Sequence, residues 1–218
     1  MSLIPIGLQC ATAVFKKNIG KGSETLPFDW MFATSKFVYQ MLILLLVENM
    51  NIEQLVREHF FKCDGKAGYV LNEHYTTGSG SALYNSKYDA IFPHDQNNED
   101  NIVKYIRRFT RLKNLILNSS NHLYFIYISQ SSLGSGNFTI DGREIVADVY
   151  LYLSNIYELI GKYRNNYEMI VFDAINTKCS IDSSKDNIHK DIILHSIKPA
   201  NCWQELMKEM QNFSINFV

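Results

Sequence analysis

Residues 102–128 read IVKYIRRFTRLKNLILNSSNHLYFIYI and contain the pattern that decides the fold. In the first part, apolar residues recur every three or four positions up to Ile116, which predicts an amphipathic helix. A polar turn at 118–121 follows, and the residues from Leu123 to Ile128 are then all apolar or aromatic. A strand without polar alternation is buried on both faces, which is typical of a parallel sheet covered by helices.

Similar patterns recur along the rest of the chain. They predict strands at 3–7, 169–174 and 192–197, and helices starting at residue 10 and at 36–49, 52–61, 145–163 and 200–212. The segment from Cys63 to Pro93 is polar and rich in Gly and Ser, so it predicts a loop, with a hairpin as the alternative. No repeat or linker interrupts the sequence. We therefore expect one α/β domain over residues 1–218, with a mostly parallel central sheet flanked by helices.

Composition excludes several classes of protein. The chain has 218 residues, of which 46% are hydrophobic and 20% charged, so it predicts a globular protein with an aromatic-rich core. A formal net charge of -1 argues against binding nucleic acid by bulk charge. The most apolar run, 37–47, is shorter than the ~20 residues that span a bilayer, and the four cysteines form no CxxC pair. We expect a cytoplasmic protein with free thiols, no metal site, no membrane span and no nucleic-acid partner.

Cys10 is the candidate nucleophile because it stands at the start of the first predicted helix, after the turn at Gly7. Unpaired backbone N–H groups and the helix dipole favour a thiolate there. Lowering a cysteine pKa from about 8.5 to about 6 takes ~3.4 kcal/mol, whereas a helix terminus supplies at most ~2. A histidine partner is therefore required. The alternative is that Cys10 is a small buried apolar residue.

His94 is the candidate base, because Pro93 precedes it at the junction between the polar segment and the long helix. The alternative is a half-exposed turn residue, with Asp95 or Asn98 capping the helix. Asp29 and Asp95 are the two acids that can orient the histidine. Asp29 belongs to the sequence Pro27-Phe28-Asp29-Trp30, which forms either an aromatic plug in the core or the wall of a cleft.

The long helix also carries a basic stripe. Lys104, Arg108 and Arg111 share one flank by their spacing, and Arg107 stands beside them. The stripe binds a phosphate or a carboxylate, or it is a solvated face balanced by acidic residues at 99 and 100. Together with Trp30, these four basic residues are the candidate substrate-binding residues.

The same residues, in the same order, resemble a bacterial and viral family of papain-like cysteine peptidases. The likeness covers roughly the first 130 residues. It rests on four motifs: Ile6-Gly7-x-x-Cys10, Thr25-x-Pro27-Phe28-Asp29-Trp30, Phe92-x-His94-Asp95 and Lys104-Tyr105-x-Arg107-Arg108-Phe109. Thr25 stands where the family usually has Ser, which preserves the hydroxyl group. The resemblance implies that Cys10 is the nucleophile and His94 its base, and it makes a papain-like α+β fold the alternative to the α/β fold.

Three functions remain open from the sequence. The first is a cysteine hydrolase that acts on a peptide, a glycan or a small molecule and needs no cofactor. A weaker similarity to capsule-polysaccharide proteins implies the second, acetyl transfer from coenzyme A to a sugar. The third is a non-catalytic relative that binds a glycan or an anion.

Overall fold

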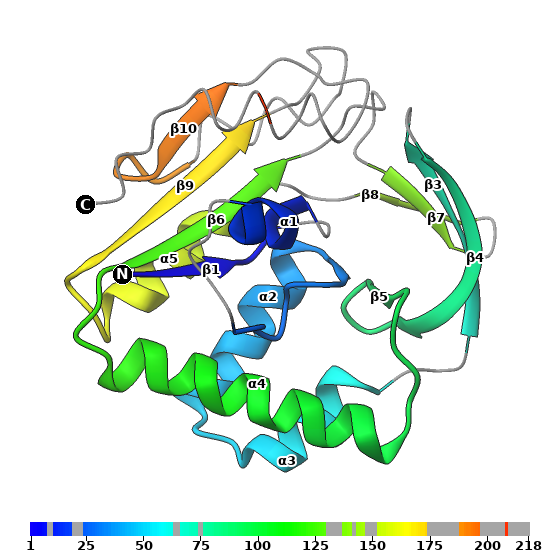
Figure 1. The fold of residues 1–218 in the computed structure, drawn as a ribbon, viewed down its shortest axis with the longest axis horizontal. Coiled ribbons are helices and arrows are strands. Elements are labelled where there is room, and N and C mark those ends of the chain that lie inside the picture. The colour runs from blue at the N-terminus through cyan, green and yellow to red at the C-terminus, as the bar shows by residue number, and fades with distance from the viewer. Residues whose placement is uncertain are drawn as a thin grey trace.

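The chain forms two β-sheets, one parallel and one antiparallel, and helices that pack against them (Figure 1). The computed structural model describes residues 1–7, 11–18, 24–62, 66–73, 76–129, 137–140, 143–146, 152–173, 188–196 and 208. The predicted last helix at 200–212 lies outside these residues except for Lys208, which is helical.

The parallel sheet has four strands in the order β1-β6-β9-β10. Their bounds are β1 (Ser2–Pro5), β6 (Leu123–Ser129), β9 (Tyr167–Asp173) and β10 (Ile193–Ser196). Each neighbouring pair is parallel, with Ile4 opposite Phe125 and Ile126 opposite Ile170. All four strands were expected from their apolar runs, and the prediction of a parallel sheet flanked by helices is confirmed.

The two faces of the parallel sheet are covered by different helices. α1 (Ala11–Asn18) contacts β1 and β6, and its Phe15 ring packs edge-on against Phe172 of β9 at 5.6 Å. Phe125 and Tyr127 of β6 point to the opposite face and join a core formed with α2 (Ser35–Leu42), α4 (Glu99–Asn118) and α5 (Leu153–Gly161). Successive side chains of a strand alternate between faces, so a fully apolar strand matches a sheet with helices on both sides.

The antiparallel sheet has six strands in the order β2-β5-β4-β3-β7-β8. Their bounds are β2 (Phe32–Ala33), β3 (Lys66–Glu73), β4 (Thr76–Asn85), β5 (Ala90–Phe92), β7 (Asn137–Ile140) and β8 (Arg143–Val146). The loop expected at 63–93 is therefore mostly strand, and the hairpin alternative is confirmed by the pairing of β3 with β4. The helix expected at 145–163 was too long, because β8 contains its first residues and α5 begins at Leu153. Backbone pairing with neighbours on both sides outweighs the low strand propensity of Gly and Ser in β4.

Side-chain caps set where the helices begin. Thr34 accepts a hydrogen bond from the backbone N–H of Phe37 at the start of α2, which continues into the π-helical segment η1 (Ile43–Val47). Asn51 caps α3 (Ile52–Gln54), which continues into a second π-helical segment, η2 (Leu55–Phe60). Asn98 caps α4 by accepting from the backbone N–H of Asn101.

Aromatic rings fill the centre of the core beneath α4. Phe60 contacts Phe92, Tyr105 and Phe109, with ring centroids 4.7 to 5.0 Å apart, and all four residues are completely buried. Such offset and edge-on pairs add to the stabilisation that burial of the rings provides. The expected aromatic-rich core is confirmed.

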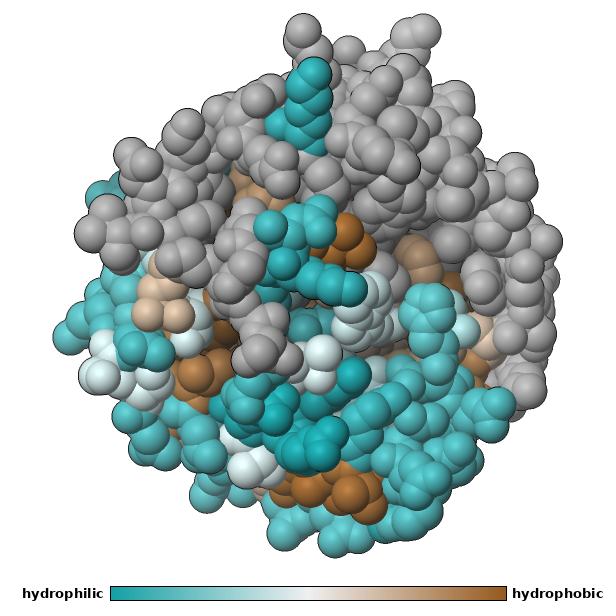
Figure 2. All heavy atoms as spheres, in the orientation of Figure 1, coloured by the Kyte–Doolittle hydropathy of each residue, from teal (hydrophilic) through white to brown (hydrophobic). Residues whose placement is uncertain are grey.

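The face of the molecule shown in Figure 2 is mostly hydrophilic where its residues are described, with small brown patches between them. Within the described parts of the chain, none of the helices combines the length and the apolar composition needed to cross a membrane.

Candidate active site

Five of the residues singled out in the sequence line one cavity of about 400 Å³: Trp30, His94, Asp95, Lys104 and Arg108. They come from three segments. Trp30 ends the turn before β2, His94 and Asp95 follow β5, and Lys104 and Arg108 lie one turn apart on α4. The volume is within the range of small-molecule sites. The fold therefore brings together a histidine, an indole ring and two cationic side chains that are up to 78 positions apart.

His94 lies in an exposed turn between β5 and α4. Pro93 precedes it, which restricts the backbone on its N-terminal side. An imidazole in such a position can reach both solvent and a ligand in the cavity. Asn98, not Asp95, caps α4, so the expected alternative of an Asn98 cap and a turn histidine describes the local backbone correctly.

Asp95 fastens this turn to α4. Its side chain is only 5% exposed, and one carboxylate oxygen accepts a hydrogen bond from the Tyr105 hydroxyl at 2.6 Å while the other pairs with Lys104. Burial, followed by the charge of Asp95, raises the pKa of Tyr105 well above its usual value, so the phenol stays a donor. Both oxygens of Asp95 are thus bound to α4, and an additional contact with His94 stays a prediction.

Asp29 lies on the core side of the Pro27–Trp30 turn and does not line the cavity. One of its oxygens accepts from the backbone N–H of Leu26 at 3.0 Å and from Lys16 Nζ at 3.4 Å. Burial raises the pKa of Asp29, partly offset by Lys16, and burial also lowers the pKa of Lys16. Phe28 is fully buried against Phe37 and Phe109, whereas Trp30 lines the cavity. Both interpretations of the motif are therefore correct for different residues: Phe28 packs in the core, and Trp30 forms part of the cavity wall.

The basic stripe is divided between several environments. Lys104 and Arg108 line the cavity, Arg107 is exposed and is not among the described residues that line it, and Arg111 forms an ion pair with Glu24 at 2.9 Å. The prediction that Glu99 balances the positive charge of the stripe is wrong, because the Glu99 carboxylate pairs with Arg57.

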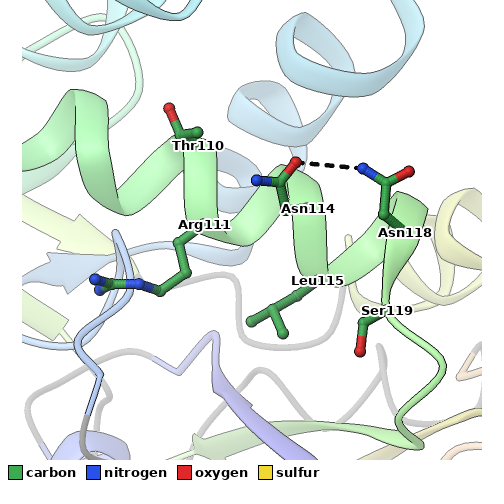
Figure 3. A pocket seen from close by; sticks show the side chains of 6 residues that line it. All are labelled: Thr110, Arg111, Asn114, Leu115, Asn118 and Ser119. Atoms are coloured by element: carbon green, nitrogen blue, oxygen red, sulfur yellow. Dashed lines mark hydrogen bonds between the residues drawn. The ribbon is translucent and has the colours of Figure 1, made fainter.

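A second hollow, of about 640 Å³, lies farther along α4 and is shown in Figure 3. Its lining residues are Thr110, Arg111, Asn114, Leu115, Asn118 and Ser119. Asn118 donates to Asn114 across one turn of the helix, and Arg111 extends away from both (Figure 3). Although this hollow is the larger of the two, its described lining includes no cysteine, histidine or carboxylate, so it is the weaker candidate for catalysis.

The candidate nucleophile Cys10 lies outside the described residues, but α1 begins at the next residue, Ala11. Gly7 lies close to both α1 and β6, because a Cβ atom there would be 2.5 Å from Thr12 Cγ2 and 3.0 Å from the Ile128 nitrogen. The absence of a side chain at Gly7 thus allows the strand-to-helix connection to approach β6. Among the described residues, no three His, Cys, Asp or Glu side chains form a group suited to a metal ion.

Two partners of the site were not found from the sequence. Lys16 was not considered, and Tyr105 was named only as part of the fourth family motif, without a polar role. A signal existed for Tyr105, because a buried phenol usually needs a hydrogen-bond partner. No comparable signal identifies Lys16, since most lysines on short helices are exposed.

A family model with the description "Putative papain-like cysteine peptidase (DUF1796)" matches residues 1–134. No curated protein and no solved structure matches the chain. The matched part extends from β1 through β6 and includes Cys10 and all the described residues that line the 400 Å³ cavity. Since the match covers more than half of the 218 residues, the chain belongs to this family of papain-like cysteine peptidases.

Proposed function

We propose that this protein is a cysteine-dependent hydrolase in which Cys10 is the nucleophile and His94 is its general base. The observation that carries the proposal is that His94 lines a ligand-sized cavity inside the part of the chain that the family model matches. Family membership supports the cysteine chemistry. The position of Cys10 directly before α1 supports its choice among the four cysteines.

The reaction is acyl transfer in two steps. The Cys10 sulfur attacks the carbonyl carbon of an amide or ester while His94 accepts the thiol proton and passes it to the leaving group. Backbone N–H groups at the start of α1 stabilise the negative oxygen of the tetrahedral intermediate. Water, deprotonated by His94, then attacks the acyl-enzyme carbon and releases the acid and the free thiol.

Asp95 and Asp29 act as positioning residues in this proposal. Asp95 holds the His94 turn against α4 through Tyr105 and Lys104. Asp29 fixes the turn that presents Trp30, and it does so through Lys16 and the Leu26 backbone. Both acids therefore act on the site through the segments that they anchor.

Coenzyme A-dependent acetyl transfer and non-catalytic glycan binding remain predictions. No contact among the described residues favours either function over hydrolysis. Arg111, which was expected to share the cleft with Lys104 and Arg108, lies at the second hollow instead.

Thiol labelling tests the proposal directly. An unperturbed cysteine with a pKa of about 8.5 is only about 1% thiolate at pH 6.5, whereas a cysteine activated to a pKa of about 6 is mostly ionised. Iodoacetamide at this pH should therefore label Cys10 before Cys63, Cys179 and Cys202, as read by peptide mass spectrometry. The substitution His94→Ala should slow Cys10 labelling by about tenfold or more, while the control His59→Gln should not change it.

Equal, slow labelling of all four cysteines in the folded protein would contradict the proposal. So would a Cys10 rate that is the same in wild type and in His94→Ala. Circular dichroism of each variant confirms that the comparison is made between folded proteins.

A further inference from the structure

Arg108 is a buried cation, and two of its three nitrogen atoms have no hydrogen-bond partner among the described residues. The residue is 7% exposed, and its guanidinium carbon lies 4.7 Å from the centre of the Tyr105 ring. Nε and Nη1 are shielded from solvent, and neither donates a hydrogen bond in the part of the chain that the structure describes. Burial of an ionised group without a partner is strongly unfavourable, so such a side chain is seldom left in this state without a function.

The charges around Arg108 do not balance it. Two carboxylates lie in this region, and each is already paired with a lysine: Asp29 with Lys16, and Asp95 with Lys104. Tyr105 stays neutral and donates its proton to Asp95. Among the described residues, these two anions and the three cations Lys16, Lys104 and Arg108 leave one positive charge, and Arg108 is the cation without a paired carboxylate.

One neighbour competes for this charge. Asp29 Oδ1 is also buried without a hydrogen-bond partner in the described structure, and the positive charge of Arg108 lowers the pKa of Asp29 in opposition to the larger effect of burial. Neither Asp29 Oδ1 nor Nε and Nη1 of Arg108 is open to solvent, so the third nitrogen, Nη2, is the guanidinium nitrogen left for a ligand in the cavity.

We infer that the cavity lined by Trp30, His94, Lys104 and Arg108 binds an oxyanionic group of the substrate, a carboxylate or a phosphate, with Arg108 as its main donor. A hydrogen bond from a guanidinium to either of these anions is charge-assisted and stronger than one between neutral groups. Lys104, which is paired with Asp95, lines the same cavity, and the Trp30 ring supplies an apolar wall for the carbon skeleton that carries the anion.

This inference rests on the proposed function and names its substrate class, because His94 shares the cavity with Arg108. The protein selects acyl compounds with a negative charge close to the scissile bond. A neutral analogue of the same shape is discriminated against, because it leaves the buried guanidinium unpaired.

The test measures binding without catalysis, in the full chain that carries Cys10→Ser. The probes are N-acetylglutamate, its neutral isostere N-acetylglutamine, and inorganic phosphate, each titrated by calorimetry. We expect an anion to bind at least about tenfold more tightly than the neutral isostere, and the preferred probe shows whether the site takes a carboxylate or a phosphate. Arg108→Gln should abolish this preference. The control Arg107→Gln removes the same charge from the same helix at an exposed position and should change the affinity less than about twofold.

If Arg108→Gln does not fold, Arg108→Lys is titrated instead, because lysine keeps the positive charge but lacks the planar guanidinium group. It should still prefer the anion, with weaker affinity. The Nε–H resonance of Arg108 in the Cys10→Ser protein gives a readout without substitution at the site, and it should shift and saturate with the anion.

Three results would overturn the inference: no saturable binding of either anion, equal weakening by Arg107→Gln and Arg108→Gln, or an Arg108 resonance that does not respond. In those cases Arg108 is satisfied internally through Asp29. Cys10 labelling is independent of this titration, so anion binding without an activated Cys10 would refute the hydrolase and keep the binding site.

Discussion

The buried ion pair between α1 and the Pro27–Trp30 turn provides the sharpest test of how the site is built. Lys16 Nζ lies 3.4 Å from Asp29 Oδ2, and the two residues are 6% and 2% exposed. At this distance two unit charges attract each other by about 5 kcal/mol for an effective dielectric constant of about 20. Lys16→Met removes this attraction and leaves the buried carboxylate without its lysine partner.

Protonation of Asp29 sets the upper limit of the loss. Protonation at pH 7 of a carboxyl with an ordinary pKa of 3.8 costs about 4.4 kcal/mol of free energy, because each unit of difference between pH and pKa corresponds to about 1.4 kcal/mol. Removal of one partner of a buried pair usually costs about 3 to 5 kcal/mol. We therefore expect Lys16→Met to lower the free energy of unfolding at pH 7 by about 3 to 4.5 kcal/mol.

The pH dependence of this loss has a definite sign. Burial raises the pKa of Asp29, and loss of Lys16 raises it further because the offsetting attraction is gone. The folded variant then binds more protons than the unfolded chain between pH 3.8 and the raised pKa. Relative to wild type, Lys16→Met should thus regain stability as the pH falls through this window.

Urea unfolding followed by circular dichroism between pH 4.5 and 7.5 measures these quantities. Lys17→Met is the matched control, since it removes a charge from the exposed neighbouring position of α1. The double substitution Lys16→Met/Asp29→Asn leaves no buried charge at the pair, so it should recover part of the stability and lose the pH dependence. A loss below about 1 kcal/mol at pH 7, or a difference from wild type that grows on acidification, would refute the reasoning.

Two further predictions concern the contributions of Arg164 and Gly7 to the stability of the fold. Arg164 is 8% exposed, and its guanidinium donates to carbonyl oxygens of Leu115, Ile116, Ser119 and Asn121 and to the side chain of Asn166. Arg164→Ala should therefore lower the free energy of unfolding by about 3 to 5 kcal/mol, against little change for the exposed Lys162→Ala, and equal effects in urea unfolding would argue against this role. Gly7→Ala should cost about 1 to 3 kcal/mol because its methyl group meets Thr12 and the Ile128 backbone, and wild-type stability would show that the connection can shift without strain.

The strands of the parallel sheet were predictable because burial on both faces leaves a strong record in the sequence. Leu123–Ile128 has no polar residue, as a strand covered by helices on both faces requires. β4 leaves no such record, because its Thr, Ser and Gly residues are held in place by backbone pairing with β3 and β5. Short apolar runs such as Ile145-Val146 also fit a helix and a strand equally well, which is why β8 was assigned to the next helix.

The residues of the candidate site that belong to local sequence motifs could be predicted. Trp30, His94, Lys104 and Arg108 were each singled out from sequence, and the structure places all four at one cavity. The helical spacing placed Arg111 on the same flank but gave no information on the length of the cavity. Arg111 follows Lys104 by seven residues, which is about 10 Å along the helix. At that point the helix lines the second hollow instead of the 400 Å³ cavity.

The pairing of β1 with β6 has a consequence for the order in which the molecule is made. Ser2 lies opposite Leu123, so β1 leaves the ribosome well before β6, its neighbour in the described part of the parallel sheet, has been synthesised. At about 5 to 20 residues per second, this delay is roughly 6 to 24 seconds. During this time the apolar β1 segment is without the strand that it pairs with in the folded protein, so this long-range contact forms late.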